Sequence, residues 1–320
     1  MLDKNLKLRK KVAIVGSGYV GASIAYALTI QCVANEIILI DLNDKKANGE
    51  AKDICHGLTN YGDVLVYAGS YSDCSECDLV IITTGRGRKP GESRLDLMGE
   101  NLKVMKDVVN SLSRYSFNGI ILIVSNPVDI LTHAVSEWMS LPIGRVIGSG
   151  CLLDTSRFVR VVSNYLKVGI EELNGYVVGE HGDNQIPVWS RMTINGDDVM
   201  AYCSQKDILW NEAIRNKLAE ETKRLGAKII SEKGNSHYGI ATCVCLLADT
   251  ILNQKSLVAS VSAPLLGEYG VRGISLSLPS VIGASGIETR IVDGWTVDEE
   301  KAFLEAADTL KRLWEQISLQ

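Results

Sequence analysis

The stretch Val12-Ala13-Ile14-Val15-Gly16-Ser17-Gly18-Tyr19-Val20-Gly21 decides the fold. Its four leading apolar residues predict a short buried strand, and the run Ala22 to Thr29 that follows predicts a helix. Gly16 allows a tight turn, Gly18 lets a pyrophosphate approach the backbone, and Gly21 lets helix and strand pack closely. The first turn of the helix offers free N–H groups to such an anion. The stretch therefore predicts the phosphate-binding turn of a βαβ unit, the alternative being a glycine-rich turn in some other α/β fold.

A second predicted strand, Ile37 to Ile40, ends on Asp41. This carboxylate stands about 20 residues after Gly21, where an acidic side chain can accept hydrogen bonds from an adenosine ribose. An acid at this position also repels a 2′-phosphate. The pattern therefore predicts a dinucleotide site that takes NAD in preference to NADP.

Further strands are expected at 64–67, 79–83 and 120–124, with helical stretches between them. Alternating strands and helices predict an α/β fold, a doubly wound parallel sheet covered on both faces. Ligands of such sheets bind at the carboxyl ends of the strands. Two of these ends carry polar residues, Thr83-Thr84-Gly85 and Ser125-Asn126-Pro127. Asn126 could hydrogen-bond near a nicotinamide, or it could simply form an Asn-Pro turn.

The segment Gly85 to Arg94 combines three glycines with three arginines and a lysine. A helix is expected to follow from about Leu95 to Ser113. A mobile cationic loop at the carboxyl end of a sheet is suited to close over an anionic substrate. The alternative is a basic loop that is merely solvated.

A domain boundary is expected at Gly148-Ser149-Gly150, which gives a nucleotide-binding domain over 1–148, with a lid at about 85–97, and a mixed α/β second domain over 149–320. In the second domain, strand-like runs at 256–262 and 273–278 predict an antiparallel hairpin. Thr296 and Glu299 have the spacing of a capping box at the start of the last helix.

His181 lies in Gly179-Glu180-His181-Gly182-Asp183, directly after the apolar run 176–178. A histidine in a glycine turn at a strand end can exchange a proton near neutral pH, although the pentapeptide alone is equally typical of a surface turn. Asp154 and Arg157 are spaced to share one face of a helix. They could form an ordinary ion pair, or they could face a cleft, one toward the histidine and one toward a substrate carboxylate.

Taken together, these residues predict a hydride-transfer site. His181 exchanges a proton with the substrate oxygen, and Asp154 fixes the imidazole tautomer and raises its pKa. Arg157 makes a planar two-point contact with a carboxylate, and Arg94 on the lid polarises the carbonyl. A competing hypothesis is an oligomer that binds NAD without catalysis, which the intact set of four residues argues against.

The composition excludes other classes of protein. The chain has 320 residues, 46% hydrophobic and 22% charged, with a net charge of −5. That charge disfavours a nucleic-acid partner, and no apolar run is long enough to span a membrane. No secretory signal is expected in residues 1–11, and the eight cysteines are expected to be reduced in a cytoplasmic protein. Cys74 and Cys77 have the spacing of a redox or zinc half-site but lack a second pair. No metal is expected.

The chain resembles the L-lactate/malate dehydrogenase family from about residue 11 to 317. The markers, in family order, are GSGYVG, IILID, KPGESRLDL, VSNPVD, LDTSRF and GEHGD. The resemblance implies a Rossmann domain, a mixed α/β catalytic domain, NAD, and homodimers or homotetramers. It also implies the roles given above for Arg94, Asp154, Arg157 and His181, and places Ser236 near the substrate. The expected cofactor-binding residues are Gly16, Gly18, Tyr19, Val20, Gly21, Asp41, Thr84, Gly85, Ser125, Asn126 and Ile240.

The resemblance leaves the 2-oxo acid substrate open. At the position of Arg88, lactate enzymes of the family typically carry Gln and malate enzymes Arg, and an unpartnered arginine over a methyl group would be costly. Glu180, Ser236 and the catalytic domain in general resemble bacterial lactate dehydrogenases instead. We therefore favour lactate, with malate or dual activity as the alternatives. Val159 and Asn174 stand where fructose 1,6-bisphosphate-activated relatives carry an arginine and a histidine, so no activation through that site is expected.

Overall fold

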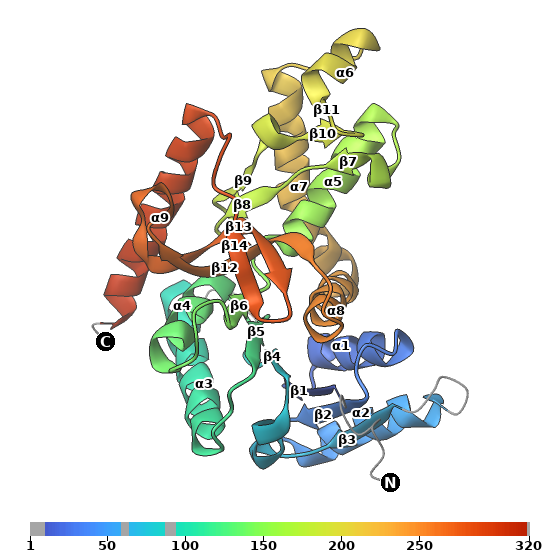
Figure 1. The fold of residues 1–320 in the computed structure, drawn as a ribbon, viewed down its shortest axis with the longest axis vertical. Coiled ribbons are helices and arrows are strands. Elements are labelled where there is room, and N and C mark those ends of the chain that lie inside the picture. The colour runs from blue at the N-terminus through green and yellow to red at the C-terminus, as the bar shows by residue number, and fades with distance from the viewer. Residues whose placement is uncertain (1–9, 59–63, 87–93, 319–320) are drawn as a thin grey trace. The chain divides into compact units, whose positions relative to one another are not determined.

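The computed structural model describes residues 10–58, 64–86 and 94–318 (Figure 1). The chain forms two compact units. The first contains residues 1–149, 237–257 and 281–289, and the second contains 150–236, 258–280 and 290–320. The chain therefore leaves and re-enters the first unit, and each unit is built from segments that are distant in sequence.

A parallel sheet organises the first unit. Its strands follow the order β3-β2-β1-β4-β5-β6, with parallel pairing wherever the register is defined. The strands are β1 (Lys11–Val15), β2 (Glu36–Ile40), β3 (Leu65–Ala68), β4 (Leu79–Ile82), β5 (Ile120–Ile123) and β6 (Val146–Gly148). This order confirms the predicted doubly wound α/β fold.

The strand order reverses between β1 and β4. Val15 pairs with Ile40 on one side and with Ile82 on the other. The residues that follow these strand ends, Gly16 and Thr83, therefore lie side by side. In open parallel sheets, this reversal point at the carboxyl edge is where ligands bind.

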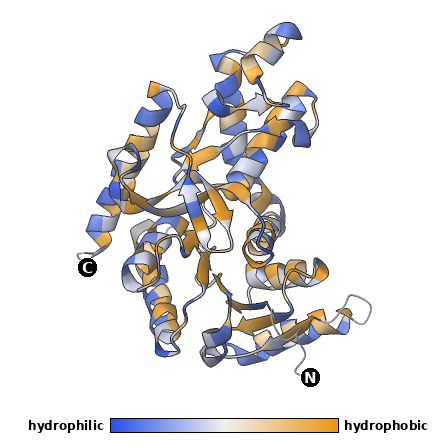
Figure 2. Cartoon of the chain, viewed as in Figure 1, coloured by the Kyte–Doolittle hydropathy of each residue, from blue (hydrophilic) through white to orange (hydrophobic). Residues whose placement is uncertain are grey.

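Helices connect the strands of the first unit and cover the sheet. They are α1 (Tyr19–Ile30), α2 (Asp44–His56), the 3-10 helix η3 (Tyr71–Glu76), α3 (Arg94–Arg114), α4 (Val128–Trp138) and α8 (Tyr238–Leu252). The strands of this sheet are mostly apolar (Figure 2). Most of their residues are buried, as expected of a sheet that is covered on both faces. α8 comes from late in the chain, yet it packs against α1 (Figure 1).

The second unit is a mixed α/β body. Its main strands follow the order β12-β13-β8-β9, and a small sheet has the order β11-β10-β7. Its hydrophobic core includes Phe158 and Val162 of α5 and Val177 of β8, and α5 packs against α7. The elements are α5 (Leu152–Leu166), η4 (Ile170–Glu172), β7 (Leu173–Asn174), β8 (Val177–Gly179), β9 (Gln185–Pro187), η5 (Trp189–Arg191), β10 (Thr193–Ile194), β11 (Asp197–Asp198), α6 (Val199–Gln205), α7 (Glu212–Lys233), β12 (Leu257–Leu266), η6 (Glu268–Gly270), β13 (Arg272–Gly283), β14 (Gly286–Arg290) and α9 (Val297–Ser318), with the ends of β12 and β13 and most of β14 grouped with the first unit.

The last helix begins with the predicted capping box. The Thr296 N–H donates to the Glu299 carboxylate at 2.8 Å, and the Glu299 N–H donates to the Thr296 hydroxyl at 3.3 Å. Glu299 is buried, and its carboxylate also accepts hydrogen bonds from the Ser190 N–H and hydroxyl, which compensate for the burial. One side chain thus caps α9 and ties it to η5.

Two features differ from the sequence-based expectation. Helix α1 begins at Tyr19, one turn before the expected Ala22, because the helix starts inside the glycine motif with Gly18 as its N-cap. The strands β7, β10 and β11 were not expected, since two residues are too few to show an alternating pattern. Among the helices of the described ranges, none is both long and apolar enough to cross a lipid bilayer.

We predict that Gly21→Ala destabilises the first unit. A Cβ at Gly21 would lie 1.9 Å from the Gly16 carbonyl oxygen, so strand and helix would have to separate. The expected cost is about 1–3 kcal/mol in the free energy of unfolding, measured by urea denaturation.

Gly49→Ala is the matched control. Gly49 lies within α2, and a Cβ there would meet no atom within 4 Å, so alanine should stabilise the helix by about 0.5–1 kcal/mol. Equal unfolding midpoints for the two variants would contradict the close-approach explanation.

Candidate active site

The glycine turn after β1 is shaped for close approach by a ligand. Gly16 has φ +103°, which favours glycine, and its N–H donates to the Ile40 carbonyl at 2.7 Å. Gly21 fits against the Gly16 carbonyl without space for a side chain. At Gly18 the opposite holds, since a Cβ there would meet no atom within 4 Å. The backbone at Gly18 is therefore open to an incoming group, and contact with a pyrophosphate stays a prediction.

Asp41 is oriented beside this turn by backbone donors. Its carboxylate accepts from the Ser17 N–H at 2.7 Å and from the Asn43 N–H at 2.9 Å. The N-terminus of α1 has no side-chain cap, and in the described part of the chain the buried hydroxyls of Ser17 and Thr84 have no hydrogen-bond partner. Free N–H groups, an ordered carboxylate and two unsatisfied hydroxyls fit a ligand rich in phosphate and ribose oxygens.

One buried side chain links the segments that follow β4 and β5. The Asn101 amide on α3 donates to the Asn126 carbonyl at 2.8 Å and to the Arg86 carbonyl at 3.3 Å, and its oxygen accepts from the Arg86 N–H at 3.2 Å. Sequence reasoning missed Asn101. The available signal was a lone amide on the apolar face of α3, between Met98 and Leu102.

Asn126 forms the turn that was considered as its alternative role. Its side-chain oxygen accepts from the Val128 N–H at 3.3 Å, and the residue is exposed at the carboxyl end of β5. The neighbouring Ser125 donates to the Ile82 carbonyl at 3.3 Å, which links β5 to β4. Contact of Asn126 with a nicotinamide stays a prediction.

The start of α8 lies beside the glycine turn. His237 Nδ1 and the Ser23 hydroxyl are 2.8 Å apart, and the His237 ring lies 5.5 Å from the Tyr19 ring. Ile240 is in the first turn of this helix. The predicted cofactor residues Tyr19 and Ile240 thus belong to neighbouring elements of the first unit.

The second unit contains the predicted proton-exchanging pair. β8 ends at Gly179, which has φ +85°, and Gly182 has φ +141°, so the segment between them turns sharply. Asp154 comes from the first turn of α5. Its Oδ2 lies 2.6 Å from His181 Nδ1, which is the contact that orients an imidazole for proton transfer at Nε2.

Asp154 also holds Arg157. The guanidinium Nη1 donates to Asp154 Oδ1 at 3.1 Å, so the ion pair and the histidine contact exist together on one carboxylate. Burial alone would raise the pKa of Asp154, but the neighbouring His181 and Arg157 lower it below the usual value. The carboxylate therefore stays ionised and stabilises a protonated imidazole.

Gly226 makes room for the Arg157 guanidinium. A Cβ at this position of α7 would lie 3.3 Å from Arg157 Nη1. Sequence reasoning missed this residue, although a glycine inside a long charged helix was an available signal. Glu180, the other family marker in the turn, is buried and accepts from the Asn184 amide at 2.5 Å.

The remaining predicted residues are placed as follows. Arg94 is the first residue of α3, and Ser236 lies between α7 and α8 in the second unit. Arg88 and most of the expected lid lie outside the described residues. Within the described residues, no group of three or more His, Cys, Asp and Glu side chains is arranged to hold a metal ion.

A parallel sheet with an open glycine turn at its reversal point, together with a carboxylate-oriented histidine, is typical of nucleotide-dependent dehydrogenases. The family description "lactate/malate dehydrogenase, NAD binding domain" matches residues 10–148, and "lactate/malate dehydrogenase, alpha/beta C-terminal domain" matches 151–318. The chain belongs to the lactate/malate dehydrogenase family. It is an NAD-dependent enzyme, which confirms the predicted cofactor and class.

Curated and solved relatives cover nearly the whole chain. An L-lactate dehydrogenase of Thermoanaerobacter sp. (strain X514) is 39% identical over 309 residues, or 97% of this chain and 99% of the relative. One from Priestia megaterium is 39% identical over 95% of each chain. The crystal structure of the minor L-lactate dehydrogenase from Enterococcus mundtii in its ligands-bound form has a TM-score of 0.93 and 38% identity, over 97% of this chain and 99% of that one.

We predict that Asp154→Asn makes the free energy of unfolding less dependent on pH in the acid range. The folded-state pKa of Asp154 is lowered, so its contribution to stability is complete above about pH 5 and is lost as the pH falls through the folded value. Asparagine cannot titrate and leaves Arg157 without its counter-charge. We expect a loss of about 1–3 kcal/mol in the free energy of unfolding at pH 7 and a shallower decline toward pH 3.

Urea denaturation at several pH values measures both effects. Asp183→Asn is the control, because it removes the same charge from a side chain that is 82% exposed. If the free energy of unfolding of Asp154→Asn falls as steeply toward acid pH as that of the wild type, protonation of Asp154 does not cause the loss of stability.

Proposed function

We propose that the chain is an L-lactate dehydrogenase that reduces pyruvate with NADH and runs reversibly. The observation that carries this proposal is the Asp154 carboxylate, which holds His181 at 2.6 Å and Arg157 at 3.1 Å in a chain of this family. The names of the relatives support lactate as the hydroxy acid.

The proposed chemistry divides among a few side chains. NAD supplies or accepts the hydride, with Gly16, Gly18, Gly21 and Asp41 as the residues that would hold it. His181 donates a proton to the carbonyl oxygen from the ring nitrogen opposite its Asp154 contact. Arg157 binds the substrate carboxylate through its guanidinium.

The lid provides the second part of the proposal. Arg94 polarises the carbonyl and stabilises negative charge on its oxygen, while Ser236 and Asn126 complete the binding of the substrate. Closure of the segment at about 85–97 would exclude water and strengthen these interactions. Tyr19, Val20, Thr84, Gly85, Ser125 and Ile240 are the further residues proposed to contact the cofactor.

A malate or dual activity is the second candidate, and Arg88 is the specific observation that favours it. A guanidinium closed over pyruvate's methyl group would be buried without a partner, whereas the second carboxylate of oxaloacetate would pair with it. The nearly full-length similarity to L-lactate dehydrogenases outweighs this single residue.

The proposal also covers the domains, the oligomeric state and the cellular location of the enzyme. We infer two functional domains, 1–148 and 149–320, and the ranges of the two family matches support this division. The resemblance further implies a homodimer or homotetramer acting in the cytoplasm, on pyruvate formed in glycolysis and consumed in fermentation. No fructose 1,6-bisphosphate activation is proposed, since Val159 and Asn174 carry no cationic group.

We expect His181→Asn to lower kcat for pyruvate by about 10²–10⁴-fold, because the proton donor is lost, with little change in KM while Arg157 remains. The loss of NADH absorbance measures the rate. His56→Asn, an exposed histidine at the end of α2, should behave as wild type. No NADH oxidation by the wild type with any 2-oxo acid would overturn the proposed function.

Arg88→Gln tests which substrate the enzyme prefers. If Arg88 pairs with a second carboxylate, the variant should lose on the order of 10²-fold or more in kcat/KM for oxaloacetate and much less for pyruvate. Arg86→Gln is the matched control, since the Arg86 guanidinium pairs with Glu100 at 2.6 Å, and it should affect both substrates alike. An equal loss on both substrates for Arg88→Gln would mean that this arginine does not select between them.

A further inference from the structure

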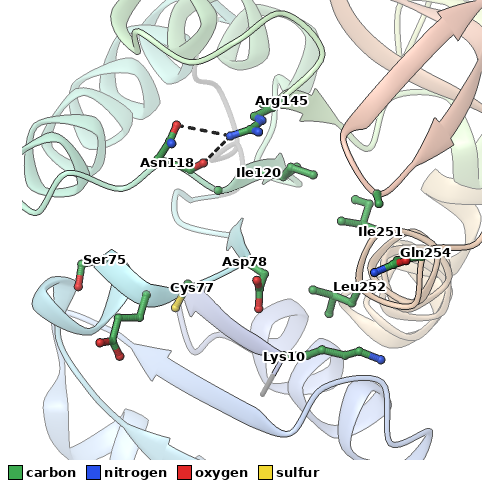
Figure 3. A pocket seen from close by; sticks show the side chains of 13 residues that line it. Lys10, Ser75, Cys77, Asp78, Asn118, Ile120, Arg145, Ile251, Leu252 and Gln254 are labelled. Carbon is green, nitrogen blue, oxygen red and sulfur yellow. Dashed lines mark hydrogen bonds between the residues drawn. The ribbon is translucent and has the colours of Figure 1, made fainter. Parts of the chain in front are cut away.

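A cavity lies at the amino-terminal edge of the parallel sheet, away from the dinucleotide turn. Its volume is about 450 Å³ (Figure 3). Its wall is formed by residues that precede β1, β4, β5 and β6, and by the end of α8. These include Lys10, Cys77, Asp78, Arg145 and Leu252. The glycine turn follows the carboxyl end of β1, so the cavity is separate from the proposed cofactor site.

A pair of cysteines adjoins this cavity. Cys74 lies in η3, and Cys77 follows its last residue. In a 3-10 helix, side chains three residues apart eclipse one another. The Cys77 N–H donates to the Cys74 carbonyl at 3.0 Å, and the Cys77 thiol donates to the Asp73 carbonyl at 3.4 Å. Three residues of a 3-10 helix rise about 6 Å, which lies within the Cα separation that a disulfide can span.

The two thiols differ in access. Cys74 is fully buried, whereas Cys77 is 6% exposed and forms part of the cavity wall (Figure 3). A reagent in the cavity can therefore reach Cys77 first, and Cys74 is placed to react only with Cys77. This division matches an attacking and a resolving cysteine.

The surroundings favour disulfide chemistry over metal binding. Two thiols alone give too few ligands for a zinc site, and the described residues add no third ligand to the pair. The neighbouring Cys74 side chain and burial raise the pKa of the Cys77 thiol. Exchange should therefore become faster as the pH rises.

We propose that Cys74 and Cys77 form a redox-active dithiol that a small organic disulfide, entering through the cavity, oxidises to an intramolecular disulfide. Cys77 loses its proton and attacks one sulfur of the reagent, whose S–S bond breaks and releases one thiol. Cys74 then loses its proton and attacks Cys77 Sγ, which releases the second thiol. The cysteines lose two electrons and two protons, and the reagent gains them.

The disulfide would form at a junction of the sheet. Asp78, the next residue, accepts from the Lys11 N–H at 2.9 Å through its carboxylate and from the Ile120 N–H at 3.0 Å through its carbonyl. The pair thus adjoins the first residues of β1, β4 and β5. None of the residues proposed for NAD or pyruvate takes part, so this inference is independent of the proposed function.

Peptide mapping of the full-length protein tests the inference. The reduced protein is incubated with 2-hydroxyethyl disulfide at pH 7, 8 and 9, and free thiols are then alkylated. We expect the peptide with Cys74 and Cys77 to lose about 2 Da, reversibly with dithiothreitol, and faster at higher pH. The exposed Cys32 should carry the reagent as a mixed disulfide, which shows that the reagent is active.

Variants separate the two roles. Cys74→Ser should trap the mixed disulfide on Cys77, and Cys77→Ser should prevent modification of the remaining Cys74. Cys203→Ser, a buried cysteine of the second unit, should form the disulfide as wild type does. A wild-type protein that modifies Cys32 but forms no 74–77 disulfide, or that keeps the reagent on Cys77, would overturn the proposal whether or not the variants fold.

Discussion

The buried carboxylate of Asp154 is the interaction on which the arrangement of His181 and Arg157 depends. An aspartate at 3% exposure would ordinarily be costly, and here two cationic partners offset that cost. The first turn of α5 supplies the carboxylate, the same helix supplies Arg157, and the turn after β8 supplies His181. Charge compensation and orientation of the proposed proton donor are thus achieved by the two oxygens of one side chain.

Much of the nucleotide-binding unit could be predicted because its determinants are local. Gly16, Gly18 and Gly21 are spaced between a strand and a helix in a turn whose sterics require glycine at positions 16 and 21, and Asp41 follows at the next strand end. The pairing of Asp154 with His181 was also predicted, although the distance in sequence is large. There the residue types and the family motifs, not the spacing, carried the inference.

Other parts of the site could not be predicted, because tertiary contacts alone give them meaning. In the sequence Asn101 is an ordinary helix residue. Its role depends on hydrogen bonds to Arg86 and Asn126, which follow two different strands. The sequence around His237 indicates only a loop, and the packing of α8 on α1 is what brings this histidine to Ser23. The two-residue strands of the small sheet have no pattern at all, since their pairing depends on partners elsewhere in the second unit.

Gly226 shows how the contacts of Arg157 limit the substitutions that could raise the thermal stability of the protein. A glycine within a helix of 22 residues weakens that helix, and alanine is the substitution that a search for heat resistance would select first. Its methyl group would press on the Arg157 guanidinium, which shares the Asp154 carboxylate with His181. Selection for thermal tolerance alone would therefore tend to disturb the Arg157 side chain, and with it the carboxylate that Arg157 shares with His181.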